Sequence, residues 1–464
     1  MTATIRELMT HPDLFGQQFG GESWAPWRAL LAGFYGLELD EDTELPTWRK
    51  ITALDAPDGP CDELWLAIGR RGGKSQIAAL LAVYESCFRD HSDKLAPGEV
   101  ATVRVMAADR PQARAVMRYT TGLLESNAML QRLVVKQSPE RIELSNRAEI
   151  EIGTASFRSA RGYSFAAVVC DEIAYWRSDQ TANPDAEIIA AVRPGLATLG
   201  GKLVALSSPY RKAGELYRTY TKHYGQPGPV LVAQAPTLTM NPTIPQRVID
   251  DAIERDESAA KAEYLAQFRD DLEDYISRDV VQKLVRPAPL ENGYKGSRSY
   301  RAFVDPAGGG RDEFTVAIGH LDGERTVVDV LQARRGVPSD ITAEYAKLLI
   351  HYGIRTVRGD RYAGSWPGDE FQKHGIQYLP STKSKGALYI DLLPKLNSGM
   401  VELPPDDRLA NQLCALERRT SRSGRDSIDH PPNGSDDRSN AVAGLVAATS
   451  KPTRKSRTVR LKWL

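Results

Sequence analysis

Residues 64–75 read Leu-Trp-Leu-Ala-Ile-Gly-Arg-Arg-Gly-Gly-Lys-Ser, and this stretch decides the fold of the first half of the chain. An apolar run over 64–68 stops at a loop rich in glycine and arginine, and a helix-like run follows over 76–87. A strand, a glycine-rich loop and a helix that begins near Gly-Lys-Ser form the setting of a phosphate-binding loop. Glycines let backbone N–H groups turn onto phosphate oxygens at the positive end of the helix.

The residues of this loop predict a nucleotide site with Mg²⁺. Lys74 would reach the β- and γ-phosphates, and the Ser75 hydroxyl would ligate the metal ion. The rest of the loop would cradle the phosphates: Gly69, Arg70, Arg71, Gly72 and Gly73. The standard pattern has glycine six positions before the lysine, where this chain has Ile68. Taken alone, the stretch is therefore also compatible with a surface turn before a helix.

The composition is that of an ordinary globular protein. Of 464 residues, 41% are hydrophobic and 26% charged, and the length suggests two or three domains. No stretch is apolar enough to span a membrane, and the N-terminus lacks the features of a signal peptide. The cysteines show no metal-ligand spacing, so we expect buried thiols in a reducing, cytoplasmic compartment, without disulfides or zinc. They are Cys61, Cys87, Cys170 and Cys414.

The formal net charge is zero, from 60 basic and 60 acidic residues. This balance argues against a non-specific nucleic-acid coat, but it is compatible with a DNA enzyme whose positive charge is local. The clearest charged block is the tail, residues 451–464, which is basic and has no acid. Three interpretations of the tail stay open: it binds DNA, it docks on another particle component, or it is a disordered end.

Short apolar strands alternate with helices from residue 64 to about 209, which predicts a parallel sheet covered on both faces. One strand, 166–170, ends in Asp171 and Glu172. We expect Asp171 to hold Mg²⁺ and Glu172 to orient and deprotonate the attacking water. An acid at a strand end is also a common helix cap. Together with Lys74, however, the pair indicates an ATPase.

Three motifs make a resemblance specific: GRRGGKS at 69–75, SARGYSFAAVVCDE at 159–172 and LVALSSP at 203–209. They resemble the motor domain of the large terminase subunit of tailed bacteriophages, the ATPase that packages DNA. The resemblance implies that Arg70 acts on the γ-phosphate of its own subunit's ATP, and Arg161 on that of a neighbour. It also implies that Ser207 belongs to a coupling motif that senses loss of the γ-phosphate. The alternative for Arg161 is a surface charge or a salt bridge.

The early helix predicted over 24–37 departs from the family. Trp27, Leu30, Leu31 and Phe34 share one of its faces, so it either packs in the core or walls the adenine pocket. The family often has a glutamine that contacts adenine there, whereas the residue after Trp27 is arginine. The specificity for the base is therefore left open by the sequence.

The second half of the chain predicts a different fold. Strands over 300–305, 313–320 and 326–332 come before a helix and a fourth strand, 356–360, and the region closes on a helix over 438–449. Acids stand at the ends of the first and fourth strands and before the last helix, in the outline of an RNase H-like domain. We expect them to hold two divalent metals that cut a phosphodiester. They are Asp305, Asp360, Asp436 and Asp437, of which we favour Asp436 over Asp437.

The motifs VDPAGGG (304–310), VRGD (357–360) and SDDRSNA (435–441) are similar to the nuclease motifs of the same family, in the same order. In the segment STKSKG (381–386), we expect Lys383 and Lys385 to hold a DNA phosphate, a contact that does not depend on base sequence.

The predicted organisation has four parts. Residues 1–209 form the P-loop ATPase core. Residues 210–296 contain a charged stretch over 245–275 that is helical in pattern, and the resemblance implies that they form a lid and linker. Residues 297–450 form the RNase H-like endonuclease, and 451–464 form the tail.

The resemblance implies a motor that uses ATP to move double-stranded DNA into a procapsid, and a nuclease that cuts concatemeric DNA. The implied partners are a portal protein, a procapsid and a small terminase subunit, with a pentameric ring of this chain and no membrane, in the host cytoplasm. Two alternatives are a helicase-type translocase whose second domain binds DNA without cutting it, and an assembly protein with an inactive ATP pocket.

Overall fold

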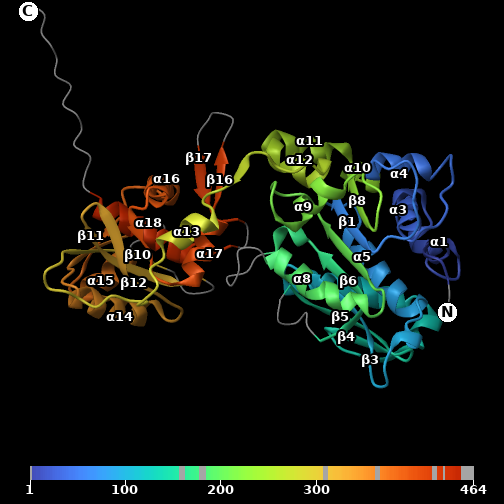
Figure 1. Cartoon of the computed structure of the whole chain (residues 1–464), viewed down its shortest axis with the longest axis horizontal. Coiled ribbons are helices and arrows are strands. Elements are labelled where there is room, and N and C mark those ends of the chain that lie inside the picture. Colours follow the sequence, from blue (N-terminus) through green and yellow to red (C-terminus); the bar gives the residue numbers. More distant parts are fainter. Residues whose placement is uncertain are drawn as a thin grey trace, which may run out of the picture. The chain divides into compact units, whose positions relative to one another are not determined.

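The structure is a computed structural model that describes residues 3–155, 162–176, 184–306, 312–360, 366–420, 426–431 and 434–450. The chain divides into two compact units, Met1–Leu272 and Glu273–Leu464. Each unit has its own sheet (Figure 1). The division falls inside the segment 210–296, so that residues 210–272 belong to the first unit and 273–296 to the second.

The first unit contains an eight-stranded sheet in the order β3-β4-β5-β2-β6-β7-β1-β8. All neighbours are parallel except at one edge, where β3, β4 and β5 pair antiparallel. The predicted parallel sheet is confirmed, although the sequence analysis did not identify β3 and β8. The strands are β1 (Glu63–Ile68), β2 (Ala101–Ala107), β3 (Val134–Gln137), β4 (Arg141–Leu144), β5 (Ala148–Thr154), β6 (Ser164–Asp171), β7 (Lys202–Ser207) and β8 (Val230–Ala235).

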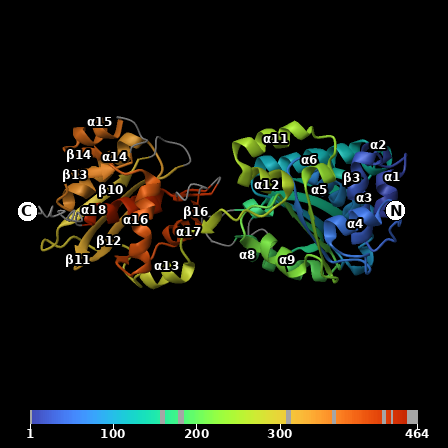
Figure 2. The same cartoon turned by 90° about the horizontal axis from the view of Figure 1, so that it is seen from above.

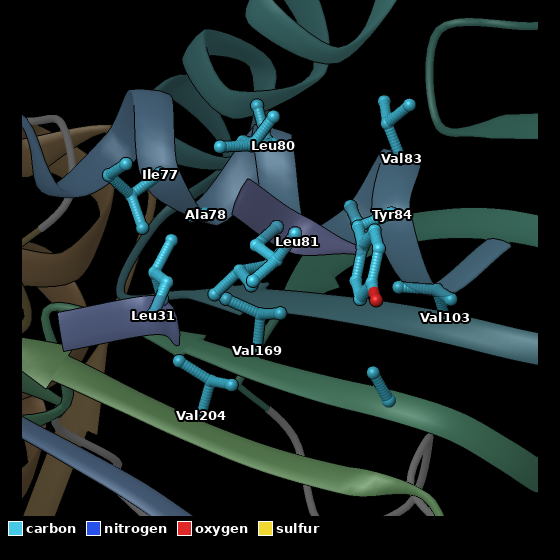
Figure 3. Close-up of a cluster of buried hydrophobic side chains, with 14 of the residues drawn as sticks. Leu31, Ile77, Ala78, Leu80, Leu81, Val83, Tyr84, Val103, Val169 and Val204 are labelled. Carbon is cyan, nitrogen blue, oxygen red and sulfur yellow. The ribbon is translucent and has the colours of Figure 1, made fainter. Parts of the chain in front are cut away.

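Alternate side chains of the buried strands face opposite helix layers, as the two-residue period of a strand requires. Leu64, Leu66 and Ile68 pack with α3 (Ala25–Phe34) and α5 (Lys74–Val83), whereas Trp65 packs with α8 (Pro184–Ala197) and α9 (Gly214–His223). Figure 3 shows side chains of α5 against Leu31 and strand valines. Both faces of the sheet are thus covered, which explains why its central strands are apolar throughout.

The remaining helices of the first unit lie around this sheet. The charged region predicted as helical over 245–275 consists of two helices, because Asp256 ends the first and caps the second by accepting a hydrogen bond from the Ala259 N–H at 3.1 Å. The helices are α1 (Ile5–Thr10), α2 (Gly16–Phe19), α4 (Leu45–Thr52), α6 (Arg110–Glu125), α7 (Ala128–Gln131), α10 (Thr237–Met240), α11 (Gln246–Arg255) and α12 (Glu257–Leu265).

The second unit contains a six-stranded sheet in the order β14-β13-β10-β11-β12-β15. Strands β10, β11 and β12 pair antiparallel, and β13 and β14 add in parallel beside β10, which is the RNase H-like arrangement expected from the sequence. The strands are β10 (Tyr300–Asp305), β11 (Phe314–Asp322), β12 (Arg325–Arg334), β13 (Thr356–Gly359), β14 (Gln377–Pro380) and β15 (Val401–Glu402); a small sheet joins β9 (Leu272–Asp274), β16 (Glu417–Thr420) and β17 (Asp426–Asp429).

Helices cover both faces of this second sheet too (Figure 2). One face packs on α14 (Pro338–His351) and α15 (Trp366–Lys373). The other packs on α13 (Arg278–Leu284), α16 (Lys385–Asn397), α17 (Asp407–Ala415) and α18 (Asp437–Thr449). Helix α18 lies very close to β10, because Gly444 has no side chain where a Cβ would collide with the Phe303 ring. Among the described residues, no helix is long and apolar enough to cross a membrane.

Candidate nucleotide and metal sites

The first candidate site lies where three parallel strands end. Strand β7 lies between β1 and β6 in the sheet, so the loops after these strands meet at one edge. They carry the phosphate-loop residues after β1, Glu172 after β6 and Ser208 after β7. The carboxyl ends of strands in an open parallel sheet are the usual place of a ligand site.

Lys74 is buried at the centre of these loops. Its ammonium group donates hydrogen bonds to the Ile68 carbonyl at 3.0 Å and to the Ser208 hydroxyl at 2.9 Å. It also lies 3.6 Å from a carboxylate oxygen of Glu172. The predicted lysine thus touches residues from all three strand ends, and Ser208 is a contact that the sequence analysis did not predict.

Asp171 faces the predicted Mg²⁺ ligand of α5. Its Oδ2 accepts a hydrogen bond from the Ser75 hydroxyl at 3.5 Å, and its Oδ1 is buried without a hydrogen-bond partner among the described residues. Burial, followed by repulsion from Glu172, raises the pKa of Asp171 to about 7. A buried carboxylate oxygen without a donor, next to a hydroxyl, fits a hard cation such as Mg²⁺.

Glu172 has a backbone conformation that is rare for a residue with a side chain. Its φ of 52° lies in the left-handed region. The side chain turns toward the end of β7, where Oε2 accepts hydrogen bonds from the Ser207 hydroxyl at 2.9 Å and from the Ser208 N–H at 3.3 Å. The predicted catalytic acid and the predicted coupling motif are therefore in direct contact.

The phosphate loop itself is held by tryptophans of the N-terminal segment. Gly73 has a φ of 92°, and a Cβ there would lie 3.1 Å from the Trp24 ring and 3.2 Å from the Trp27 nitrogen. Trp27 donates a hydrogen bond from Nε1 to the Gly72 carbonyl at 2.8 Å. This contact gives the early helix a specific role beside the loop, in addition to core packing.

A cavity of about 330 Å³ adjoins the loop. It is lined by loop residues 70–75, by Trp24 from the segment expected either to pack in the core or to wall the adenine pocket, and by side chains that the sequence analysis missed, among them Tyr119 and Asn241. Arg28, at the position of the expected adenine contact, instead donates hydrogen bonds to the carbonyls of Phe19 and Gly21, at 2.7 and 2.8 Å. No sequence signal marked Tyr119 and Asn241, because they come from segments far from the phosphate loop along the chain.

Of the two arginines expected to act on the γ-phosphate, Arg70 lies within the described residues. Arg70 lines the cavity, but its guanidinium pairs with Glu263 of α12 at 3.1 Å. The Arg70 N–H also donates a hydrogen bond to the Glu263 carbonyl, so the loop and α12 are joined twice. Arg161 lies outside the described residues.

The second candidate site lies in the second unit, where β10 and β13 end side by side. Asp305 and Asp360 are joined by Asn440 of α18, whose Nδ2 donates hydrogen bonds to Oδ2 of both, at 2.8 and 3.1 Å. The Oδ1 of Asn440 is buried and has no partner among the described residues. Two carboxylates and an amide oxygen without a donor form an oxygen-rich set that fits Mg²⁺ or Mn²⁺.

The pKa of Asp305 is raised well above its usual range. The main cause is burial of its carboxyl group, and repulsion from nearby acids, Asp437 among them, adds to it. The pKa of Asp437 is raised too, mainly by burial.

Asp437 accepts hydrogen bonds from the Glu313 N–H at 2.9 Å and the Ser435 hydroxyl at 3.0 Å. Asp436 instead accepts one from Tyr389 at 2.9 Å and lies 3.1 Å from the Lys385 ammonium. Asp436 and Asp437 both raise the pKa of Asp305, so both acids lie near enough to act on its charge.

The two lysines predicted to hold a DNA phosphate both have acidic partners. Lys383 pairs with Asp391, and Lys385 lies 2.7 Å from Asp429 as well as beside Asp436. His430 adds a nitrogen to the cluster of Asp429 and Asp436, but the Lys385 ammonium already contacts both of these acids.

Comparison with known proteins gives matches among solved structures only. No family model matches the chain, and no curated protein matches it. The large terminase of bacteriophage HK97 is 16% identical to this chain, with a TM-score of 0.38. The match covers 92% of this chain and 99% of the HK97 chain. The chain resembles phage large terminases.

Two further terminases give similar results. A large terminase from a thermophilic bacteriophage, solved in complex with ADP, is 12% identical, covers 86% of this chain and 96% of its own, and has a TM-score of 0.37. The large terminase nuclease of the thermophilic phage G20c, solved with magnesium, is 24% identical, covers 34% of this chain and 84% of its own, and has a TM-score of 0.30. The function of this chain is therefore inferred from its own residues.

Proposed function

We propose that this protein is a viral DNA-packaging motor that hydrolyses ATP to move double-stranded DNA into a procapsid and that cleaves concatemeric DNA at a metal-dependent endonuclease site. The single observation that carries the proposal is the pairing of two sites in one chain. One places Lys74, Ser75, Asp171 and Glu172 around the end of one sheet, and the other places Asp305, Asp360 and Asn440 at the end of another.

In the ATPase half, the phosphate loop and Lys74 would hold the triphosphate, and Ser75 with Asp171 would hold Mg²⁺. A divalent ion there supplies positive charge to the phosphate oxygens. Glu172 would orient and deprotonate the attacking water once its carboxylate leaves the hydroxyl of Ser207. Arg70 would reach the γ-phosphate after it separates from Glu263, and Arg161 would serve the ATP of a neighbouring subunit.

In the nuclease half, Asp305, Asp360, Asp436 and Asp437 would hold two divalent metals. Such a pair of ions activates a water and stabilises the leaving oxygen of a phosphodiester. Asn440 would keep the two strand-end carboxylates at a fixed separation. Lys383 and Lys385 would bind DNA phosphates in exchange for their present acidic partners.

The proposal extends to partners and domains. The segment 210–296 would act as lid and linker, since α12 already contacts the phosphate loop through Arg70 and Glu263. The chain would work as a pentameric ring on a portal, with a small terminase subunit that delivers DNA, in the host cytoplasm.

A pair of variants tests the proposal. In Lys74→Ala, ATP hydrolysis and procapsid-dependent protection of DNA from nuclease should fall by about 10²–10³-fold, because the buried cation that contacts the phosphates is lost. Cleavage of plasmid DNA with Mn²⁺ should persist. In Asp305→Asn, cleavage should be lost and ATP hydrolysis kept.

Each contrary result favours one alternative. Cleavage that survives Asp305→Asn unchanged would favour a translocase whose second domain only binds DNA. Absence of ATP hydrolysis in the unaltered protein, even with procapsids and DNA, would favour an assembly protein.

A further inference from the structure

A row of three arginines lies on the exposed side of α6, in the first unit. Arg110, Arg114 and Arg118 are four residues apart, so they fall on one side of the helix, and all three are exposed. None of them has a hydrogen-bonded or ion-paired side chain among the described residues. We call these residues the α6 arginine row.

The chain around the row carries more basic than acidic residues. From Asp109, which caps the start of α6, to Gln137, the stretch also contains Arg132 and Lys136, and its acids are Asp109 and Glu125, at the two ends of α6. In a chain with a formal net charge of zero, this stretch is locally basic. An exposed row of arginines in a locally basic stretch is the footprint of an anionic partner.

We propose that the α6 arginine row contacts backbone phosphates along one strand of duplex DNA. The inference rests on the proposed packaging function and names the surface by which the motor unit would hold its substrate. A helix rises 1.5 Å per residue, so the row is about 12 Å long. One strand of B-DNA presents a phosphate every 3.4 Å of axis, so the row spans about four phosphates, of which the three arginines can contact three. Arginine's planar fork suits phosphate oxygens.

An acidic protein face is the other partner that such a row suits, but its binding to the row would be weaker than that of DNA. Exposed ion pairs between proteins each contribute little, because water and salt screen them. A polyanion adds the release of condensed counterions for each phosphate that is neutralised. The exposed guanidinium groups, which pair with no acid among the residues that the structure describes, therefore favour DNA.

The row also lies beside the nucleotide site. Tyr119, next to Arg118, lines the cavity of the phosphate loop, and α6 packs on α5, which begins at Lys74 (Figure 2). DNA bound to α6 would thus contact a helix that packs directly on α5, which carries the phosphate-binding lysine.

The test is the salt dependence of DNA binding by the full-length protein. A labelled 30-base-pair duplex is titrated in EDTA, which stops cleavage, at several salt concentrations. A plot of log K against log salt has a negative slope. In the triple variant Arg110→Gln, Arg114→Gln, Arg118→Gln this slope should become shallower by about 2.7, or 0.9 for each lost phosphate contact. The loss should be the same for any base sequence. Glutamine has a helix propensity close to that of arginine, so α6 should stay folded.

Two further variants sharpen the result. The matched control Lys50→Gln, Lys222→Gln, Arg247→Gln removes three exposed cations from other helices of the same unit and should leave the slope unchanged. Gly122 lies twelve residues after Arg110 with open space around a Cβ. Gly122→Arg should therefore extend the row and steepen the slope by about 0.9, whereas Gly122→Gln should not.

The outcomes separate this inference from the function on which it rests. If the unaltered protein binds no duplex even at low salt, the proposed function is overturned together with the row. If it binds, and the triple variant keeps the same slope, the row alone is overturned. If the triple variant binds DNA normally but no longer self-associates, the arginines belong to a protein interface instead.

Discussion

Asn440 is the residue that joins the two strand-end carboxylates of the second unit. Without its amide, Asp305 and Asp360 would lose their shared donor and repel one another. We expect Asn440→Ala to lower Mn²⁺ affinity or DNA cleavage by about 10–100-fold, the usual effect of losing a group that orients metal ligands. Calorimetric titration with Mn²⁺ and a plasmid-nicking assay measure these quantities. ATP hydrolysis is the control and should not change; cleavage equal to that of the unaltered protein would contradict the role.

Glu85 gives the first unit a pH-dependent stability. It is buried and accepts a hydrogen bond from Tyr35 at 2.6 Å, and burial raises the pKa of its carboxyl group although Arg89 and Lys202 attract the charged form. The native state therefore binds more protons than the unfolded state between the ordinary and the raised pKa, so stability falls as pH rises through that window.

Glu85→Gln should remove this loss, because glutamine keeps an acceptor for Tyr35 and carries no charge. We expect the variant to melt at a higher temperature than the unaltered protein at pH 8, with the difference shrinking toward acid; each unit of pKa shift corresponds to about 1.4 kcal/mol. Thermal melts from pH 5 to 8 provide the measurement. A difference independent of pH would show that the carboxyl group does not titrate as described.

At the scale of an element, the position of helix α18 depends on a glycine, Gly444, which has no side chain. Gly444 lets the helix lie against the Phe303 ring of β10, and the same helix carries Asn440 to Asp305. Gly444→Ala should push the two elements apart, with a cost of about 1–3 kcal/mol for overpacking and a loss of DNA cleavage. Thermal unfolding and plasmid nicking report the two effects.

Gly368 of α15 offers a matched control in the same unit, since a Cβ there meets no atom within 4 Å. Gly368→Ala should leave cleavage intact and change stability by no more than about 1 kcal/mol, in the stabilising direction. If both alanine variants behave alike, the close packing of α18 does not position the site.

At the scale of the whole molecule, the two proposed ligands should act on different units. Mg²⁺ with a slowly hydrolysed ATP analogue at 100 times its dissociation constant should stabilise the first unit by about 2.7 kcal/mol. Five of the seven tryptophans lie in that unit, so intrinsic fluorescence follows its unfolding: Trp24, Trp27, Trp48, Trp65 and Trp176. The fluorescence transition should move up by several degrees. In Lys74→Ala it should not move, and an equal shift in that variant would place the nucleotide elsewhere.

Much of the fold was accessible from the sequence because each unit is built on local signals. The apolar run before the phosphate loop and the acids after β6, β10 and β13 marked strand ends directly, and their predicted strands are present. Strand β3 was missed because it is short and exposed at the sheet edge, so it lacks the apolar signature of a buried strand. The single helix expected over 245–275 is two helices, since the cap at Asp256 interrupts a pattern that looked continuous.

By itself, the sequence determined which candidate residues stand at which strand ends, because that depends on neighbours along the chain. Only the tertiary structure decided what each of them touches. Lys74 meets Ser208 across 134 residues, and Arg70 meets Glu263 across 193. Asn440 reaches Asp305 across 135. Such contacts depend on how sheets and helices pack, and helix α18 can bring its amide to two carboxylates only where a missing side chain at Gly444 lets it approach the strand.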